Sequence, residues 1–159
     1  YPRVFAYILK SDLTFLVQSD TTVGFVSSSK KALCDLKKRS INKPFLQVCT
    51  SLRDLQALVR VPSRYKNLVR RSQKTTFIYP KQHSHSLAIR VVKEAKHKRF
   101  LDKLSAKVVF STSANLTGKE FDAEHALKNA DIVVHQGEPF ASNAPSKIFK
   151  ISHNIQRIR

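Results

Sequence analysis

The chain has 159 residues, of which 42% are hydrophobic, so it is long enough for one domain, residues 1–159, with a substantial buried core. Its 29 lysines and arginines outnumber 11 aspartates and glutamates, and this net charge of +18 favours RNA or nucleotides as partners over an acidic membrane surface. Two cysteines without metal or disulfide spacing, and no membrane-length apolar run or signal-like segment, argue against disulfide-stapled and membrane-spanning classes and predict a cytoplasmic protein.

Strands and short helices alternate through the first half of the chain. Apolar runs rich in β-branched and aromatic side chains predict strands over residues 5–9, 14–17 and 45–49. Amphipathic spacing predicts helices over residues 29–38, 51–58 and 62–71. Ser51 is the N-cap type of residue, and Pro62 suits a first helical turn, so both helices begin where the sequence favours it.

The second half continues the alternation. Strands are predicted over residues 75–79, 86–92, 108–110, 132–135, 146–151 and 155–159, with a turn at 80–83 between the first two. Helices are predicted over residues 99–104 and 122–129, the second capped by Asp122. We therefore expect one mixed α/β domain, in which the strands near Phe15, Phe45, Ile89, Val109 and Ile148 join one twisted sheet with helices mainly on one side.

The most informative stretch runs from Phe110 to Gly118. The buried strand Val108-Val109-Phe110 leads directly into Ser111-Thr112-Ser113-Ala114-Asn115-Leu116-Thr117-Gly118. Hydroxyls and a carboxamide at the end of a strand suit phosphate or carboxylate oxygens, because such ends open into the ligand crevices of α/β sheets. A Ser/Thr-rich turn without a ligand is the alternative.

This run resembles the Thr-Ser-Ala-Asn-x-Ser-Gly motif of the YrdC-like family (YrdC/YciO) of threonylcarbamoyl-AMP synthases, with Thr117 in the place of the second serine. Four further segments resemble family motifs in the same order along the chain. They are Ser19-Asp20-Thr21-Thr22-Val23-Gly24-Phe25, Lys37-Lys38-Arg39-Ser40 with Lys43-Pro44-Phe45, Ser86-Leu87-Ala88-Ile89-Arg90-Val91, and Ala144-Pro145-Ser146-Lys147-Ile148 with Arg159 beyond it. The match covers nearly the whole chain.

The resemblance implies a twisted, mostly mixed sheet with flanking helices and a concave basic face. It also implies a nucleotidyltransferase that joins L-threonine, bicarbonate and ATP into threonylcarbamoyl-AMP and pyrophosphate. That intermediate supplies the threonylcarbamoyl group of a modified adenosine in tRNA, so tRNA and other tRNA-modification proteins are implied partners. No metal cage is visible in the sequence, so Mg²⁺ would be carried by the triphosphate and water.

Family positions assign the candidate site residues. The ATP-binding candidates are Lys37, Arg39, Lys43, Ser86, Ser113, Asn115 and Arg159. The threonine-binding candidates are Thr21, Arg90, Ser111 and Ser146, with Arg90 matched to the substrate carboxylate. Positive charge and hydrogen-bond donors suit this reaction, because a triphosphate that loses pyrophosphate needs positioning and charge stabilisation. The alternatives are that Lys37 and Arg39 only end a basic helix and that Arg90 is a surface residue.

The sequence departs from the family at several motif positions. Val23 replaces a tyrosine and Lys38 replaces a glycine, so activity is less secure than fold. The alternative function is a non-enzymatic YrdC-like protein that binds structured RNA, and another carbamoyl-adenylate reaction is a third possibility. A basic stretch without any acid supplies the RNA-contact candidates Arg60, Arg64, Arg70 and Arg71, with Val61, Tyr65, Leu68 and Val69 predicted to face inward. A zinc site at His83, His85 and His97 is disfavoured, because no cysteine or carboxylate lies at ligand spacing.

Overall fold

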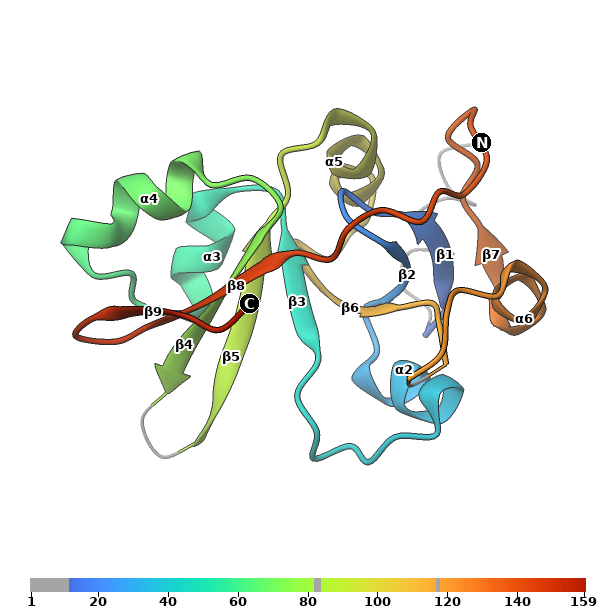
Figure 1. The fold of residues 1–159 in the computed structure, drawn as a ribbon, viewed down its shortest axis with the longest axis horizontal. Coiled ribbons are helices and arrows are strands. Elements are labelled where there is room, and N and C mark those ends of the chain that lie inside the picture. Colours follow the sequence, from blue (N-terminus) through green and yellow to red (C-terminus); the bar gives the residue numbers. More distant parts are fainter. Residues whose placement is uncertain (1–11, 82–83, 117) are drawn as a thin grey trace.

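The computed structural model describes residues 12–81, 84–116 and 118–159, and within them nine strands form one mixed sheet in the order β7-β1-β2-β6-β3-β5-β4-β8-β9 (Figure 1). The strands are β1 (Phe15–Gln18), β2 (Val23–Ser27), β3 (Leu46–Cys49), β4 (Thr75–Lys81), β5 (Ser84–Val91), β6 (Val108–Ser113), β7 (Ile132–Val133), β8 (Lys147–Ile151) and β9 (Ile155–Arg157). The helices are α2 (Lys30–Lys37), α3 (Leu52–Leu58), α4 (Lys66–Arg71), α5 (Ala95–Asp102), α6 (Ala123–Asn129) and the 3-10 helix η1 (Ser63–Tyr65). The predicted mixed sheet with flanking helices is confirmed.

Most predicted elements are present within a few residues of their expected bounds. The predicted turn at 80–83 begins too early, because Pro80 and Lys81 still belong to β4. The strand expected over 132–135 ends at Val133, and the helix expected over 62–71 is divided into η1 and α4. The strand predicted over 5–9, the turn residues 82 and 83, and Thr117 lie outside the described residues.

Strand β2 is the one element of the described sheet that sequence patterning missed. Its residues carry a family motif but no clear strand pattern, because Gly24 interrupts the apolar run Val23-Gly24-Phe25-Val26. In the sheet Gly24 pairs with Val17 of β1 and Ser113 of β6. A Cβ atom at Gly24 would lie 3.0 Å from the Thr112 carbonyl oxygen, so glycine permits this close pairing.

Side chains at the helix ends determine where the helices start and stop. Ser29, Ser51 and Asp122 each accept a backbone N–H of the first turn, as predicted for Ser51 and Asp122. Helix α5 begins at Ala95, four residues before the predicted start, because the Glu94 carboxylate accepts the N–H groups of residues 96 and 97. Lys38, which stands where the family has glycine, ends α2 in the left-handed conformation with φ of 48°.

Strand register assigns each core cluster to one face of the sheet. The helix face carries Leu16, Phe25, Phe77 and Ile89, which pack against α2, α3, α4 and α6 through residues that include Leu33, Ala126, Leu55 and Val69. The opposite face carries Val17, Val26, Val48 and Val109, which pack under α5 through Leu101 and Leu104. Among the described residues, four α-helices lie on one face and one on the other, which confirms the expectation that helices lie mainly on one side.

The chain crosses the sheet once more near its end. Strand β7 lies at one edge of the sheet and β8 lies next to the other edge, and residues 134–146 connect them across several strands (Figure 1). The Ala141 N–H donates to the Gln18 side chain at 2.9 Å, and Lys96 forms an ion pair with Glu138. We call residues 134–146 the crossing segment.

A Leu33→Ala substitution is expected to lower the free energy of unfolding by about 2–5 kcal/mol, because this side chain of α2 is fully buried in the helix-face core. Leu127→Ala in α6 is the matched control, since Leu127 is 46% exposed and the same change is then worth within about 0.5 kcal/mol. Urea unfolding of both variants measures the difference. Equal losses in the two variants would contradict the assignment of the core.

Candidate functional site

A cavity of about 710 Å³ opens on the face of the sheet that also carries α5. Its floor includes Gly24 of β2, Leu46 of β3, and Ser111 and Ser113 of β6, which the strand register places side by side. The loop from Lys119 to Phe121 and the crossing segment, through Ala141, Ser142, Pro145 and Ser146, complete its walls. The cavity therefore gathers segments from six parts of the sequence at one place.

Eight of the candidate substrate-binding residues line this cavity. Four come from the ATP-binding set, and all four residues of the threonine-binding set are present. The residues are Thr21, Arg39, Arg90, Ser111, Ser113, Asn115, Ser146 and Arg159. They lie as much as 138 positions apart in sequence, so their convergence comes from the sheet topology and not from local spacing.

Three ATP-binding candidates do not line the cavity. Lys37 lies next to it, but its Nζ donates to the main-chain carbonyls of Ser113, at 2.9 Å, and of Asn115. This ties the end of α2 to the turn after β6, so that Lys37 supports the wall of the cavity. Lys43 is exposed in the loop before β3, and Ser86 is exposed on β5. Neither side chain lines the cavity.

Two arginines are held at the cavity by contacts with the protein. The Arg39 Nη2 donates to the Pro44 carbonyl oxygen at 3.0 Å, and its Cζ lies 4.8 Å from the centre of the Phe45 ring. The Arg159 Nε donates to the Ser146 carbonyl oxygen at 3.2 Å. Both guanidinium groups thus keep donors that are available to an anionic ligand.

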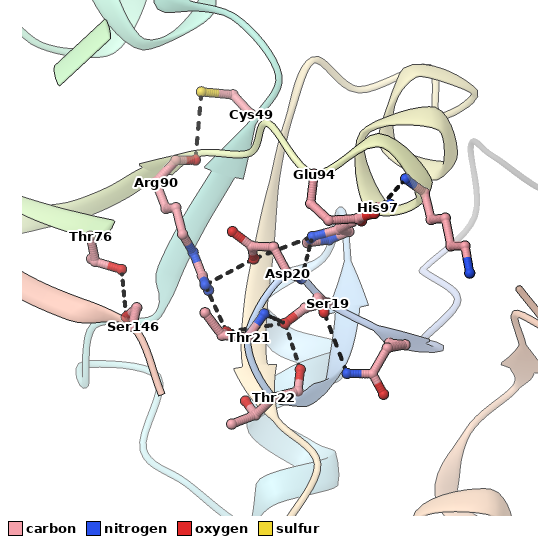
Figure 2. Close-up of polar contacts among 12 residues, drawn as sticks. Ser19, Asp20, Thr21, Thr22, Cys49, Thr76, Arg90, Glu94, His97 and Ser146 are labelled. Carbon is pink, nitrogen blue, oxygen red and sulfur yellow. Dashed lines mark hydrogen bonds and ion pairs between the residues drawn. The ribbon is translucent and has the colours of Figure 1, made fainter. Parts of the chain in front are cut away.

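Two hydroxyls meet at the start of β8. The Ser146 and Thr76 hydroxyls lie 3.0 Å apart in a buried hydrogen bond between the crossing segment and β4 (Figure 2). Across the cavity, the Asn115 Nδ2 donates to the Lys119 carbonyl oxygen, while its Oδ1 is buried without a hydrogen-bond partner in the described residues. An unpartnered carboxamide oxygen can accept from a ligand, so Asn115 is suited to a donor such as a hydroxyl or an amine.

A buried ion pair joins Arg90, which lines the cavity, to Asp20 (Figure 2). Arg90 is 4% exposed, although it belongs to β5, and its Nη1 donates to the Asp20 Oδ1 at 3.0 Å and to the Thr21 Oγ1 at 2.7 Å. Its Nε is buried and has no hydrogen-bond partner among the described residues. The alternative that Arg90 is a snorkelling surface residue is therefore wrong, and the buried guanidinium keeps an unpaired donor.

His97 extends this network behind the ion pair. Its ring is fully buried on α5, and Nδ1 lies 3.2 Å from the Asp20 backbone nitrogen and 3.5 Å from Asp20 Oδ1 (Figure 2). The sequence predicts no role for Asp20 and suggests His97 only as a disfavoured metal ligand. The burial of His97 is indicated by its helical spacing from Leu101, which places both residues on the buried side of α5.

Burial and charge shift the ionisation of this network. Burial opposes ionisation of Asp20, but the positive charge of Arg90 and the other polar contacts of the carboxylate outweigh it, so the pKa of Asp20 is lowered. The pKa of Arg90 is also lowered, because burial and the charge of Arg159 outweigh the attraction of Asp20. Burial and the neighbouring charge of Arg39 lower the pKa of Lys37. Asp20 and Arg90 thus form a charged pair within the protein.

The basic stretch before β4 lies on the surface. Arg60, Arg64, Arg70 and Arg71 are all exposed, and Arg64 packs over the Tyr65 ring at 4.9 Å. The predicted inward face is correct for Val61 and Val69, which are buried, but wrong for Leu68, which is 43% exposed. Helix α4 has only six residues and buries one side chain, which leaves too narrow an inward face for Leu68.

The described residues contain no group of three or more histidine, cysteine, aspartate or glutamate side chains placed to bind a metal ion. Glu120 is the one acidic residue among the described residues that line the cavity. In the part of the chain described here, no helix combines the length and apolar character that a membrane crossing requires.

Comparison with known families gives one match to a family model. The model of the Sua5/YciO/YrdC family, described as "Telomere recombination", matches residues 8–159. No curated protein sequence matches the chain.

Solved structures share the fold at low sequence identity. Sua5 from P. abyssi aligns over 99% of this chain with 17% identity and a TM-score of 0.81, and its complex with L-threonine aligns with 16% identity and a TM-score of 0.77. YciO from E. coli aligns over 100% of this chain and 89% of its own, with 16% identity and a TM-score of 0.76. Full-length HypF in a phosphate- and nucleotide-bound form aligns over 99% of this chain and 28% of its own, with 16% identity and a TM-score of 0.76. The chain spans about half the length of the Sua5 structures, at 52% and 53%.

Asp20→Asn is expected to destabilise the protein at neutral pH by about 1–3 kcal/mol, because it leaves the buried Arg90 without its counter-charge. The folded-state pKa of Asp20 is lowered, so this stabilisation is present above the ordinary value of 3.8 and is lost as the pH falls through the folded-state pKa below it. Urea unfolding at pH 7 and below pH 3.8 should therefore show the difference between wild type and variant shrinking. A difference that stays constant with pH would contradict the ion pair.

Proposed function

The chain belongs to the Sua5/YciO/YrdC family, and we propose on this basis that it joins L-threonine, bicarbonate and ATP into threonylcarbamoyl-AMP and pyrophosphate. The observation that carries the proposal is the convergence of eight family-matched residues around one cavity. Sua5, which shares the fold, has been solved with L-threonine, and HypF has been solved with phosphate and nucleotide.

The ATP end of the cavity is proposed to lie between Arg39, Ser113, Asn115 and Arg159. Two guanidinium groups with free donors can hold phosphate oxygens by paired hydrogen bonds and can stabilise the charge that develops as pyrophosphate leaves. The Ser113 hydroxyl and the Asn115 carboxamide supply neutral contacts to the nucleotide. Lys37 contributes indirectly, because it fixes the turn that carries both residues.

The amino-acid end is proposed to lie at Arg90, Thr21, Ser111 and Ser146. The free donor of Arg90 suits the threonine carboxylate, and the hydroxyls suit the polar groups of a small amino acid. The threonine amine attacks bicarbonate-derived carbon to give a carbamate with loss of water, and the carbamate oxygen then attacks the α-phosphorus of ATP. Pyrophosphate leaves as the new P–O bond forms, so the protein needs to position and stabilise charge and forms no covalent intermediate.

The donors at the cavity do not fit a Mg²⁺ ion held by protein side chains. Glu120 is the one carboxylate on the described lining, and the Asp20 carboxylate is engaged by Arg90. We therefore propose that Mg²⁺ reaches this site on the triphosphate, with water completing its coordination.

The proposed biological role is modification of tRNA in the cytoplasm, in which the adenylate donates its threonylcarbamoyl group to adenosine. We propose that residues 1–159 form one YrdC-like domain, and other tRNA-modification proteins are the proposed partners of the reaction that follows.

Binding of structured RNA is the second candidate function, with or without the synthase reaction. It is favoured by the net charge of +18 and by four exposed arginines in a stretch that contains no acid from Arg60 to Lys74. Such a surface attracts phosphates without reading sequence. The motif departures, Val23 and Lys38, would matter to catalysis but not to this interaction.

A pyrophosphate-release assay with threonine, bicarbonate and ATP tests the proposed reaction, and Arg39→Ala tests the ATP end. The variant is expected to weaken ATP binding by about 1.5–3 kcal/mol, the range of a hydrogen bond to a charged group, as measured by calorimetry. Arg39→Lys should restore part of the affinity, because it keeps the charge and loses the planar fork. Arg60→Ala is the control, since Arg60 is exposed and lies outside the cavity. Unchanged ATP affinity in a folded Arg39→Ala protein would remove Arg39 from the site.

Replacing Arg64 and Arg71 together by alanine is expected to lower RNA affinity and to flatten its salt dependence by about one unit of slope for each lost phosphate contact. Lys107→Ala with Lys128→Ala removes the same charge from other exposed positions and should leave the slope nearer to wild type. Binding isotherms over a range of salt concentrations measure both pairs. If the two double variants lose affinity equally, the interaction is a property of net charge alone and this surface is not an RNA site.

A further inference from the structure

His97 is buried in a way that packing alone does not explain. Its ring is 0% exposed, it does not line the cavity, and its Nε2 is buried without a hydrogen-bond partner among the described residues. An unpaired buried N–H is unfavourable, so an apolar side chain of similar size would serve the core better. The benefit of histidine at this position must therefore come from its other nitrogen.

The Nδ1 atom of His97 acts as a hydrogen-bond acceptor. The Asp20 backbone N–H donates to it at 3.2 Å, which is closer than the 3.5 Å to the Asp20 carboxylate oxygen. An accepting Nδ1 carries no proton, so a proton on the ring must be on Nε2. The backbone of His97 is held in turn, since its main-chain N–H donates to the Glu94 carboxylate at 2.7 Å in the first turn of α5.

The contact with His97 determines how Arg90 meets the cavity. His97 holds the backbone of Asp20, and the Asp20 carboxylate and the adjacent Thr21 hydroxyl both accept from the Arg90 Nη1 (Figure 2). Within the described residues, neither Nε nor Nη2 of Arg90 donates to a protein atom. These two nitrogens form the side edge of the guanidinium, which binds a carboxylate through two parallel hydrogen bonds.

We propose that His97 is a positioning residue that acts through Asp20 to hold Arg90 with its Nε and Nη2 edge free for a ligand carboxylate. The part of this inference that names the ligand rests on the proposed function. The part that concerns His97, Asp20 and Arg90 does not depend on which reaction the cavity performs.

Nitrogen-15 NMR of the wild-type protein tests the arrangement without any substitution. The ring of His97 should carry a proton on Nε2 and none on Nδ1, and the Arg90 Nε–H should give a resolved, slowly exchanging signal, assigned by its loss in Arg90→Lys. A proton on Nδ1 of His97 overturns the proposal, because the Asp20 N–H would then lack its acceptor.

Three variants at His97 separate positioning from packing. In His97→Asn, the side-chain Oδ1 lies the same number of bonds from the backbone as the histidine Nδ1. It can therefore accept the same hydrogen bond from the Asp20 N–H. His97→Gln places its amide near the Nε2 position, and His97→Leu retains apolar volume only. The Arg90 Nε–H should exchange about tenfold faster in His97→Leu and His97→Gln, and at nearly the wild-type rate in His97→Asn. Equal exchange in all three folded variants overturns the proposal, and thermal unfolding identifies a variant that does not fold.

Asp20→Asn provides the second test where the histidine variants do not fold. It keeps the backbone N–H that His97 accepts and weakens the contact with Arg90, so it should speed exchange at Arg90 while the His97 tautomer is unchanged. Protection of Arg90 that persists in folded Asp20→Asn overturns the proposed route through Asp20.

Steady-state kinetics then separate this inference from the proposed function. His97→Leu should raise KM for threonine by about tenfold and leave KM for ATP within about twofold, with His97→Asn restoring the threonine value. Equal changes in both constants would indicate a general structural effect and overturn the assignment to the amino-acid end. Wild-type protein without threonine-dependent pyrophosphate release refutes the proposed function, and the NMR results still decide whether His97 positions Arg90.

Discussion

The contact between Arg90 and Asp20 is the interaction on which the site depends. A guanidinium that is 4% exposed is stable in the fold only with a partner, because an unpaired buried charge is far more unfavourable than a paired one. Replacing such a pair by apolar residues is often neutral or stabilising, so the pair is a poor explanation of stability alone. Its position at a cavity explains it better, since the unpaired Nε can serve a ligand.

The sheet places this pair at a boundary between two environments. On the same face, Val48 and Val109 pack under α5, whereas Leu46 and Ser111, nearer the cavity, belong to its floor. Helix α5 therefore covers one part of this face and supplies His97 to the pair, while the crossing segment bounds the part that holds the cavity. Arg90 lies on β5 and His97 on α5, so two regular elements hold the turn between β1 and β2 that carries Asp20, which suits recognition of a small ligand.

Local patterns predicted most of the fold, and family motifs predicted most residues of the cavity. Strand β2 was not predicted, because Gly24 breaks the apolar pattern. The reason for a glycine at this position is its close pairing with β6. The contact of Asp20 with His97 was not predictable, since it joins residues 77 positions apart and neither has an unusual local sequence. Lys37 has the residue type expected for a phosphate contact, but its ammonium group donates to main-chain carbonyls of the turn after β6. The protein and a ligand compete here for the same ammonium group, and the sequence alone does not show which of them binds it.

The arginines at the cavity and the arginines of the surface stretch differ in whether their guanidinium groups are hydrogen-bonded to the protein. Arg39, Arg90 and Arg159 each donate to protein oxygens at the cavity, which fixes their orientation and leaves selected donors free. Arg60, Arg70 and Arg71 are exposed, and the described residues form no salt bridge with them. Oriented donors favour one small ligand, whereas unpaired surface charges favour any polyanion. The excess positive charge of the chain is therefore compatible with a specific cavity, and polyanion binding by itself does not argue against binding of a small ligand there.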